Sequence, residues 1–204
     1  MTATERTAVC FDLDYTLVDF DQRFDEICRD ALATELDPVT DEAVEALLIA
    51  LGDALDDQVA DPYESAVGAA CEEAGVDADH AILRDRLQDE EFAATSVAAP
   101  VREALSTLAE DEDLVLCVLS NGHDEVHDLD GYVDHVVTSY DAGGTKASGE
   151  PYALLRERVD ADRYVMIGDD YEGDIEAARE AGFVPIHYEE TDGPDFFATL
   201  SAML

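Results

Sequence analysis

Residues 114–119 form a continuous apolar run, LVLCVL, which constrains the fold more than any other feature of the chain. A run of this length without alternating polar residues is typical of a strand covered on both faces, as in a parallel sheet. Shorter strand-like runs occupy residues 8–11, 133–138, 164–167 and 183–187, and helical patterns occupy residues 100–109, 151–158, 170–181 and 194–204. Because strands and helices alternate, we predict an α/β fold with a Rossmann-like parallel sheet.

The stretch from residue 20 to residue 95 differs, because it contains helical patterns and no strand-like run. The first pattern places Phe24, Ile27, Cys28, Ala31 and Leu32 on one face, and the second does so for Val44, Leu47, Leu48, Leu51 and Leu55. We therefore predict an α/β core made of residues 1–19 and 96–204, with a helical cap made of residues 20–95. Ligands of open α/β sheets bind beyond the carboxyl ends of strands, so an insert directly after the first strand would cover the site.

The charge of the chain is extreme, with 51 acidic residues against 11 Lys and Arg and a net charge of -40. Such a charge opposes compaction unless salt screens it, so we interpret the chain as adapted to very high intracellular salt, as in haloarchaea. The simpler alternative is an ordinary acidic cytosolic protein. The negative field argues against nucleic acid and anionic membranes as partners.

No apolar run approaches membrane-spanning length, and residues 1–7 lack the charged-then-apolar pattern of a signal peptide, so we expect a cytoplasmic protein. The four cysteines show no metal-binding spacing and are interpreted as reduced thiols.

Three polar clusters follow predicted strands: Asp12-Leu13-Asp14, Ser120-Asn121-Gly122 and residues 168–174. Paired carboxylates suit a metal ion, or a nucleophile beside a general acid. A hydroxyl followed by backbone N–H groups that enter a helix suits an anion, and Asp169 with Asp174 suits a hard cation such as magnesium. Each cluster alone could be a solvated strand end, a turn or a helix cap. Together, at the carboxyl ends of strands in one sheet, they predict a single site.

Lys146 is the only lysine in the chain, since the other ten basic residues are arginines. A lone lysine can survive by accident, but in so acidic a chain we expect it to serve a purpose. Its ammonium group would neutralise the charge that develops during phosphoryl transfer.

These clusters resemble the four motifs of the haloacid dehalogenase (HAD) superfamily. Phe11-Asp12-Leu13-Asp14-Tyr15-Thr16-Leu17 is similar to its nucleophile motif, and Leu119-Ser120-Asn121-Gly122 to its second motif. Ile167-Gly168-Asp169-Asp170, continuing to Asp174-Ile175, is similar to its acidic fourth motif. The resemblance spans the whole chain and implies a HAD-like core with a helical, C1-type cap in the place of the insert.

The resemblance also implies roles for individual residues. Asp12 would attack phosphorus and carry the phosphoryl group, and Asp14 would protonate the leaving oxygen and then activate water. Ser120 and the Asn121 N–H would hold the phosphoryl oxygens, and Lys146 would bridge the phosphate and the nucleophile. A Mg²⁺ ion would bind the Asp12 carboxylate, the Asp14 backbone carbonyl and Asp169, and Asp174 would orient Lys146 or a water molecule bound to the metal.

The segment around Lys146 departs from the family pattern, which usually has lysine, proline, an acid and proline before the next helix. Counted from Ser139 and Gly143, Lys146 occupies the place of the family's lysine. Counted back from Pro151, that place falls on Ser148. We therefore expect a lengthened loop after Lys146.

The expected activity is the Mg²⁺-dependent hydrolysis of a small phosphorylated metabolite by a monomer or dimer. A phosphosugar mutase and a dehalogenase of the same superfamily are alternatives, although Asp14 favours phosphate esters because a halide needs no proton to leave. A non-catalytic binding protein on the same fold is another alternative, and an acidic DNA mimic would explain the charge but not the clusters.

Overall fold

The computed structural model describes residues 5–59, 61–122, 129, 131–189 and 192–204. These residues group into two compact units, Met1–Asp19 with Val97–Leu204, and Phe20–Ser96. The first unit is built on a five-stranded sheet of order β5-β4-β1-β6-β7. Its strands are β1 (Thr7–Phe11), β4 (Leu114–Ser120), β5 (His135–Thr138), β6 (Arg163–Gly168) and β7 (Val184–His187). Every pairing between them is parallel, which confirms the predicted fold class.

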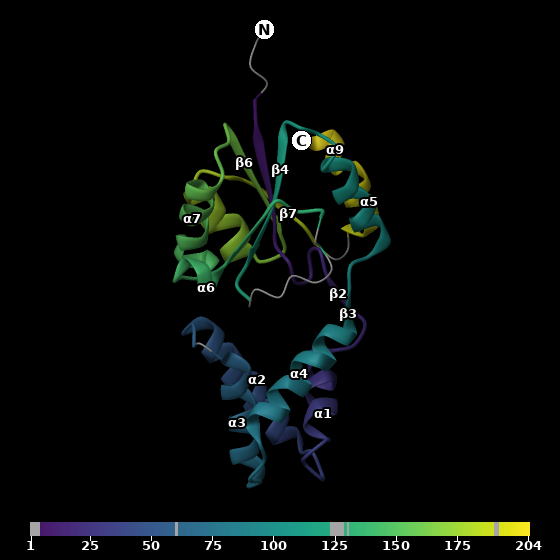
Figure 1. The fold of residues 1–204 in the computed structure, drawn as a ribbon, viewed down its shortest axis with the longest axis vertical. Coiled ribbons are helices and arrows are strands. Elements are labelled where there is room, and N and C mark those ends of the chain that lie inside the picture. The colour runs from purple at the N-terminus through teal and green to yellow at the C-terminus, as the bar shows by residue number, and fades with distance from the viewer. Residues whose placement is uncertain (1–4, 60, 123–128, 130, 190–191) are drawn as a thin grey trace. The chain divides into compact units, whose positions relative to one another are not determined.

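The sheet is apolar on both faces because alternate residues of each strand point to opposite sides. Val9 and Phe11 of β1 belong to one buried cluster, and Ala8 and Cys10 belong to the other. Figure 1 shows helices on both sides of the sheet. Helices α5 (Ala99–Leu108) and α9 (Pro194–Met203) cover the first face, and α7 (Glu150–Arg158) covers the second. The central strands are therefore shielded from water, as the apolar run at residues 114–119 predicts.

Two helical segments of the first unit differ from the sequence prediction. The helix predicted at residues 170–181 begins as a wider π-helix, η2 (Tyr171–Ala177), and ends as a short α-helix, α8 (Ala178–Glu180). The short helix α6 (Ser139–Ala142) and the 3₁₀ turn η1 (Lys146–Ser148) were not predicted, because segments this short carry no periodic pattern.

The second unit contains the helices α1 (Phe24–Leu32), α2 (Asp41–Asp56), α3 (Pro62–Ala74) and α4 (His80–Ala94). Its core includes Ile27, Leu32, Leu47 and Leu83, which are almost completely buried. The predicted apolar faces of α1 and α2 point into this core. The short strands β2 (Asp19–Phe20) and β3 (Thr95–Ser96) pair where the chain passes between the units. Among the described residues, no helix is long and apolar enough to cross a membrane.

Candidate active site

Asp12 follows the last residue of the central strand β1 and is buried, with 7% of its surface exposed. Its backbone N–H continues the sheet by donating to the Ile167 carbonyl oxygen at 2.8 Å. The chain then turns sharply: the Leu13 carbonyl oxygen accepts hydrogen bonds from Leu17 and Val18, and Tyr15 adopts a positive φ of 61°. Non-glycine residues rarely adopt this conformation, so the turn that holds Asp12 and Asp14 is strained.

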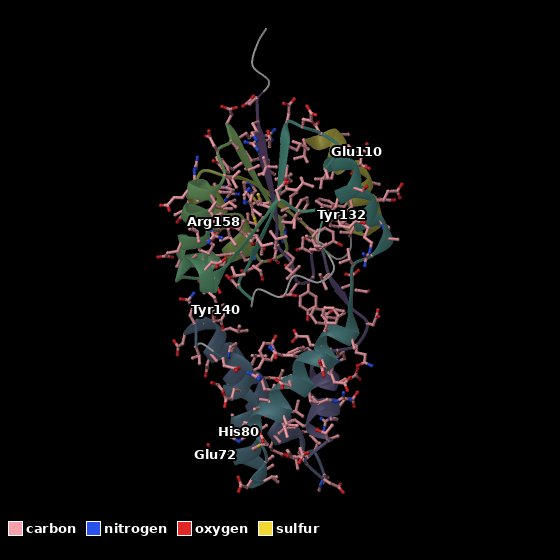
Figure 2. All side chains as sticks on the ribbon, viewed as in Figure 1. Glu72, His80, Glu110, Tyr132, Tyr140 and Arg158 are labelled. Carbon is pink, nitrogen blue, oxygen red and sulfur yellow. The ribbon has the colours of Figure 1, made fainter. Side chains whose placement is uncertain are left out.

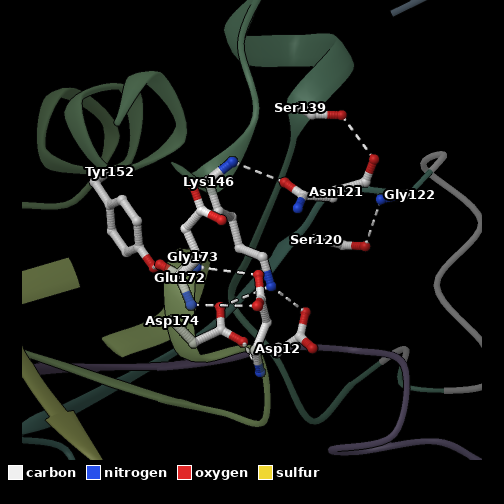
Figure 3. A network of polar contacts seen from close by, with 11 residues as sticks. Asp12, Ser120, Asn121, Gly122, Ser139, Lys146, Tyr152, Glu172, Gly173 and Asp174 are labelled. Carbon is white, nitrogen blue, oxygen red and sulfur yellow. Dashed lines mark hydrogen bonds and ion pairs between the residues drawn. The ribbon is translucent and has the colours of Figure 1, made fainter. Parts of the chain in front are cut away.

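Lys146 reaches Asp12 from the η1 turn, as Figure 3 shows. Its Nζ lies 2.6 Å from Asp12 Oδ1 and 2.7 Å from Asp174 Oδ1, and its side chain is 2% exposed. Burial by itself lowers the pKa of Lys146, but the two carboxylates outweigh that effect, so the pKa is raised above its ordinary value. The buried group is therefore an ammonium ion placed between two acids.

Asp174 is fully buried on the η2 helix. Its second carboxylate oxygen, Oδ2, accepts a hydrogen bond from the Asp170 N–H at 3.2 Å. Burial raises the pKa of Asp174, whereas Lys146 opposes this shift. Since both oxygens of Asp174 have partners in the protein, its geometry suits a residue that orients Lys146.

Asp14 and Asp169 complete the acidic group. Burial and the charge of Asp12 raise the pKa of Asp14 to about 6, against an opposing effect of Lys146. The same two causes raise the pKa of the half-buried Asp169. One carboxylate oxygen from each of Asp12, Asp169 and Asp174 lies within 4.8 Å of the others. Hard oxygen ligands at such spacing fit Mg²⁺.

Ser120 and Asn121 lie at the end of β4, beside β1 in the sheet. Ser120 is 2% exposed, and its Oγ accepts the Gly122 N–H at 2.9 Å, which leaves the hydroxyl hydrogen available to donate. A Cβ placed on Gly122 would lie 3.7 Å from Asp14 Oδ2, so the Ser120 segment lies close to Asp14. Residues 123–128, which follow Gly122 and where the backbone N–H groups after Ser120 were expected to enter a helix, lie outside the described residues.

Residues 7–182 match the family of haloacid dehalogenase-like hydrolases. The chain belongs to this family. No curated protein sequence matches the chain.

Solved structures of this hydrolase family are similar over most of the chain. The 2-haloacid dehalogenase from Pseudomonas syringae pv. Tomato has a TM-score of 0.68 and 29% identity, covering 92% of this chain and 88% of that one. The HAD-hydrolase YfnB from Bacillus subtilis, bound to magnesium, has a TM-score of 0.67 and 21% identity, covering 88% of this chain and 86% of that one. The HAD phosphatase from Thermococcus onnurineus has a TM-score of 0.62 and 20% identity, covering 90% of this chain and 86% of that one. These likenesses agree on the fold of this hydrolase.

The lengthened loop expected after Lys146 does not move the lysine away from the acids of this HAD-like hydrolase. The segment closes as the η1 turn, Gly149 follows with a positive φ of 95°, and α7 begins at Glu150. A glycine permits this left-handed conformation without steric cost. The compact turn therefore delivers the ammonium group to Asp12.

Several contacts that support this site escaped the sequence analysis. The Asn121 Oδ1 accepts the Lys146 N–H at 2.7 Å, and the Tyr152 hydroxyl donates to the Gly173 carbonyl oxygen at 2.6 Å. Asp170, inside the acidic motif, accepts the N–H groups of Glu172 and Gly173 and so caps the η2 helix. These partners are distant in sequence or belong to an irregular helix, so periodicity could not reveal most of them. Only the Asp170 cap had a local signal, an acid before a helix.

The absence of a side chain at Gly168 leaves room for the side chain of Asp174. A Cβ at Gly168 would lie 2.8 Å from Asp174 Cβ and closer still to its carboxylate. We expect Gly168→Ala to lower the free energy of unfolding by about 1–3 kcal/mol, because the side chain of a buried acid must shift. Urea denaturation would measure the change.

Gly52 supplies the matched control for Gly168. It lies in α2, and a Cβ placed there would meet no atom within 4 Å. Gly52→Ala is expected to stabilise the protein by about 0.5–1 kcal/mol through helix propensity. Equal effects of the two alanine substitutions would contradict the role given to Gly168.

Proposed function

We propose that this hydrolase cleaves small phosphate monoesters through an aspartyl-phosphate on Asp12, with Mg²⁺ as cofactor. One observation carries the proposal. Of the described residues, Asp12 and Asp174 are the only buried acids in a chain of 51 acids, and both contact its only lysine, itself buried. Burying three charged groups is costly, and a costly arrangement at the carboxyl end of a central strand points to catalysis.

The proposed reaction has two steps. An Asp12 carboxylate oxygen forms a bond to phosphorus while the bond from phosphorus to the leaving oxygen breaks, and Asp14 gives that oxygen its proton. Water then attacks the phosphorus, Asp14 takes the proton from the water, and the bond between Asp12 and phosphorus breaks to release inorganic phosphate. Ser120, the Asn121 N–H and Lys146 would bind the phosphoryl oxygens during both steps.

The carboxylates of Asp12 and Asp169, with the Asp14 backbone carbonyl, would hold the Mg²⁺ ion. When bound, the ion would offset the repulsion between an anionic nucleophile and an anionic ester. The proximity of one carboxylate oxygen of Asp12 to one of Asp169, within 4.8 Å, supports the two carboxylates of this donor set. In the same scheme Asp174 would keep Lys146 in place.

A dehalogenase is the second candidate, favoured by the likeness to a 2-haloacid dehalogenase. In that reaction a halide leaves carbon without needing a proton, so the general-acid role of Asp14 would be lost. The turn that holds Asp14 beside Asp12, strained at Tyr15, is easier to understand if Asp14 takes part. We therefore place phosphate ester hydrolysis first, with phosphoryl transfer by a mutase as a variant of it.

The experiment compares phosphate release from an aryl phosphate with halide release from 2-chloropropionate, in molar potassium chloride with Mg²⁺. We expect phosphate release that a chelator abolishes, and no halide release. In Asp14→Asn, kcat for phosphate release should fall about 10²–10⁴-fold, because the general acid and base is lost. Halide release that survives in Asp14→Asn would assign the dehalogenase activity instead.

We propose further that the helical unit, Phe20–Ser96, serves as the family's helical cap. It consists almost wholly of helices and is inserted in the sequence shortly after Asp14, which follows strand β1. An insert at the end of a strand can act as a lid that controls access to substrate.

We also propose that the chain is adapted to high salt. Figure 2 shows carboxylate oxygens projecting from the surfaces of both units, as for Glu72 and Glu110, which are exposed. The Debye length falls from about 10 Å at 0.1 M salt to about 3 Å at 1 M, so screening should relieve the repulsion. We expect the melting temperature to rise by roughly 10 °C between 0.1 and 2 M potassium chloride. Sucrose, which stabilises without screening, is the control; an unchanged melting temperature in salt would refute the adaptation.

A further inference from the structure

The side chain of Asn121 connects the end of β4 with the Lys146 turn (Figure 3). Its Oδ1 accepts the backbone N–H of Lys146 at 2.7 Å, although the two residues are 25 positions apart. Its backbone carbonyl oxygen accepts the hydroxyl of Ser139 at 2.8 Å, at the start of α6. Asn121 therefore ties together the segments that follow β4 and β5 and the turn that carries the lysine.

The hydrogen bonds within the Lys146 turn leave the Lys146 N–H to an outside partner. Ser148 donates to the Thr145 carbonyl oxygen from its N–H at 3.0 Å and from its Oγ at 2.7 Å, and the Gly149 N–H donates to the Lys146 carbonyl oxygen at 3.1 Å. The turn spans only Lys146–Ser148, and the residue before it, Thr145, makes no side-chain capping bond. A 3₁₀ turn of this length has little stability of its own. On the η2 side, a Cβ added to Gly173 would lie 3.3 Å from Lys146 Cβ, so the packing there is close. Among the described residues, no hydrogen bond joins η2 to the Lys146 backbone.

We propose that the side chain of Asn121 is a positioning residue for Lys146. By holding the backbone of Lys146, it keeps the ammonium group between Asp12 and Asp174, at 2.6 Å and 2.7 Å. This role differs from that of the Asn121 N–H, which would contact the phosphoryl group. The kinetic part of the proposal rests on the proposed hydrolysis of phosphate esters, whereas the structural part does not.

The chain offers a direct probe, because Lys146 is its only lysine. Protein labelled with ¹⁵N-lysine gives one backbone amide signal and one ammonium signal in NMR spectra, both from Lys146. In the wild type the amide should exchange slowly with solvent, and the buried ammonium should give a resolved signal. In Asn121→Ala the amide should exchange at least about tenfold faster, and the ammonium signal should shift or broaden.

Two further variants sharpen the experiment. Asn121→Asp keeps an oxygen acceptor for the Lys146 N–H, so its amide should stay protected. Thr138→Ala is the matched control, because Thr138 Oγ1 accepts the Asp141 N–H at 3.1 Å on the adjacent segment and has no bond to Lys146. Its Lys146 signals should match those of the wild type. Unchanged exchange in Asn121→Ala, or equal loss of protection in Asn121→Asp, would overturn the proposal.

Kinetics supply the second readout. With the aryl phosphate, Asn121→Ala should lower kcat by about 10–100-fold and change KM by less than about threefold, since a misplaced lysine affects the transition state most. In a Lys146→Met background the same substitution should cost no further activity. A full additional loss there would mean that Asn121 acts independently of Lys146. If the wild type releases no phosphate, the proposed function fails, and the NMR signals alone decide the role of Asn121.

Discussion

Asp12→Asn is expected to lower kcat for phosphate release by about 10⁴-fold or more, because the amide cannot act as the nucleophile. The side chains have nearly the same shape, and Lys146 Nζ can still donate to the remaining oxygen, as it does at 2.6 Å in the wild type. The variant should therefore fold. Phosphate release, a denaturation curve and single-turnover trapping of labelled phosphoryl enzyme would measure the change.

Asp160→Asn provides the control for that substitution, since Asp160 is an exposed acid of the same unit. It removes the same charge and should leave kcat within about twofold. A folded Asp12→Asn protein that keeps more than a few per cent of the wild-type rate would exclude Asp12 as the nucleophile.

Lys146→Met should have the second large effect, on stability as well as on activity. It removes the cation that lies between Asp12 and Asp174, which are 7% and 0% exposed. An uncompensated buried charge typically costs about 3–5 kcal/mol, so we expect a loss of that size in the free energy of unfolding without Mg²⁺. Urea denaturation with and without Mg²⁺ would measure it, and the metal should stabilise the variant more than the wild type. The kcat for phosphate release should fall about 10³-fold.

Arg158→Met tests whether the loss of any ion pair would lower the free energy of unfolding as much as Lys146→Met does. Arg158 lies 3.3 Å from Asp141 in the same unit, but its side chain is 39% exposed, so water screens the pair. We expect a loss of at most about 1 kcal/mol. If the two methionine variants lose equal stability, the buried contacts of Lys146 contribute no more to stability than an exposed ion pair does.

The sequence was sufficient for the elements with a long-range pattern. The apolar run at residues 114–119 became the buried strand β4, and the predicted apolar faces of α1 and α2 pack into one core. Their periodicity follows from local geometry and burial, so a single chain displays it. The wider η2 helix was missed because a π-helix of the same residues has no separate sequence signature.

For the candidate site too, the sequence predicted some features and only the structure decided others. Residue type and strand position were enough to select Asp12, Asp14, Ser120, Asn121, Lys146, Asp169 and Asp174, and a resemblance supplied their roles, which stay predictions. What only the tertiary structure decided is how these groups meet. The residues of the loop did not determine whether Lys146 contacts Asp12, because a loop's path depends on distant contacts rather than on its own composition. Asn121 Oδ1, 25 residues away, holds that loop, and Gly168 leaves space for Asp174. Local patterning thus determined the strands and the chemical groups at their ends, whereas packing between distant segments decided which atoms come within bonding distance.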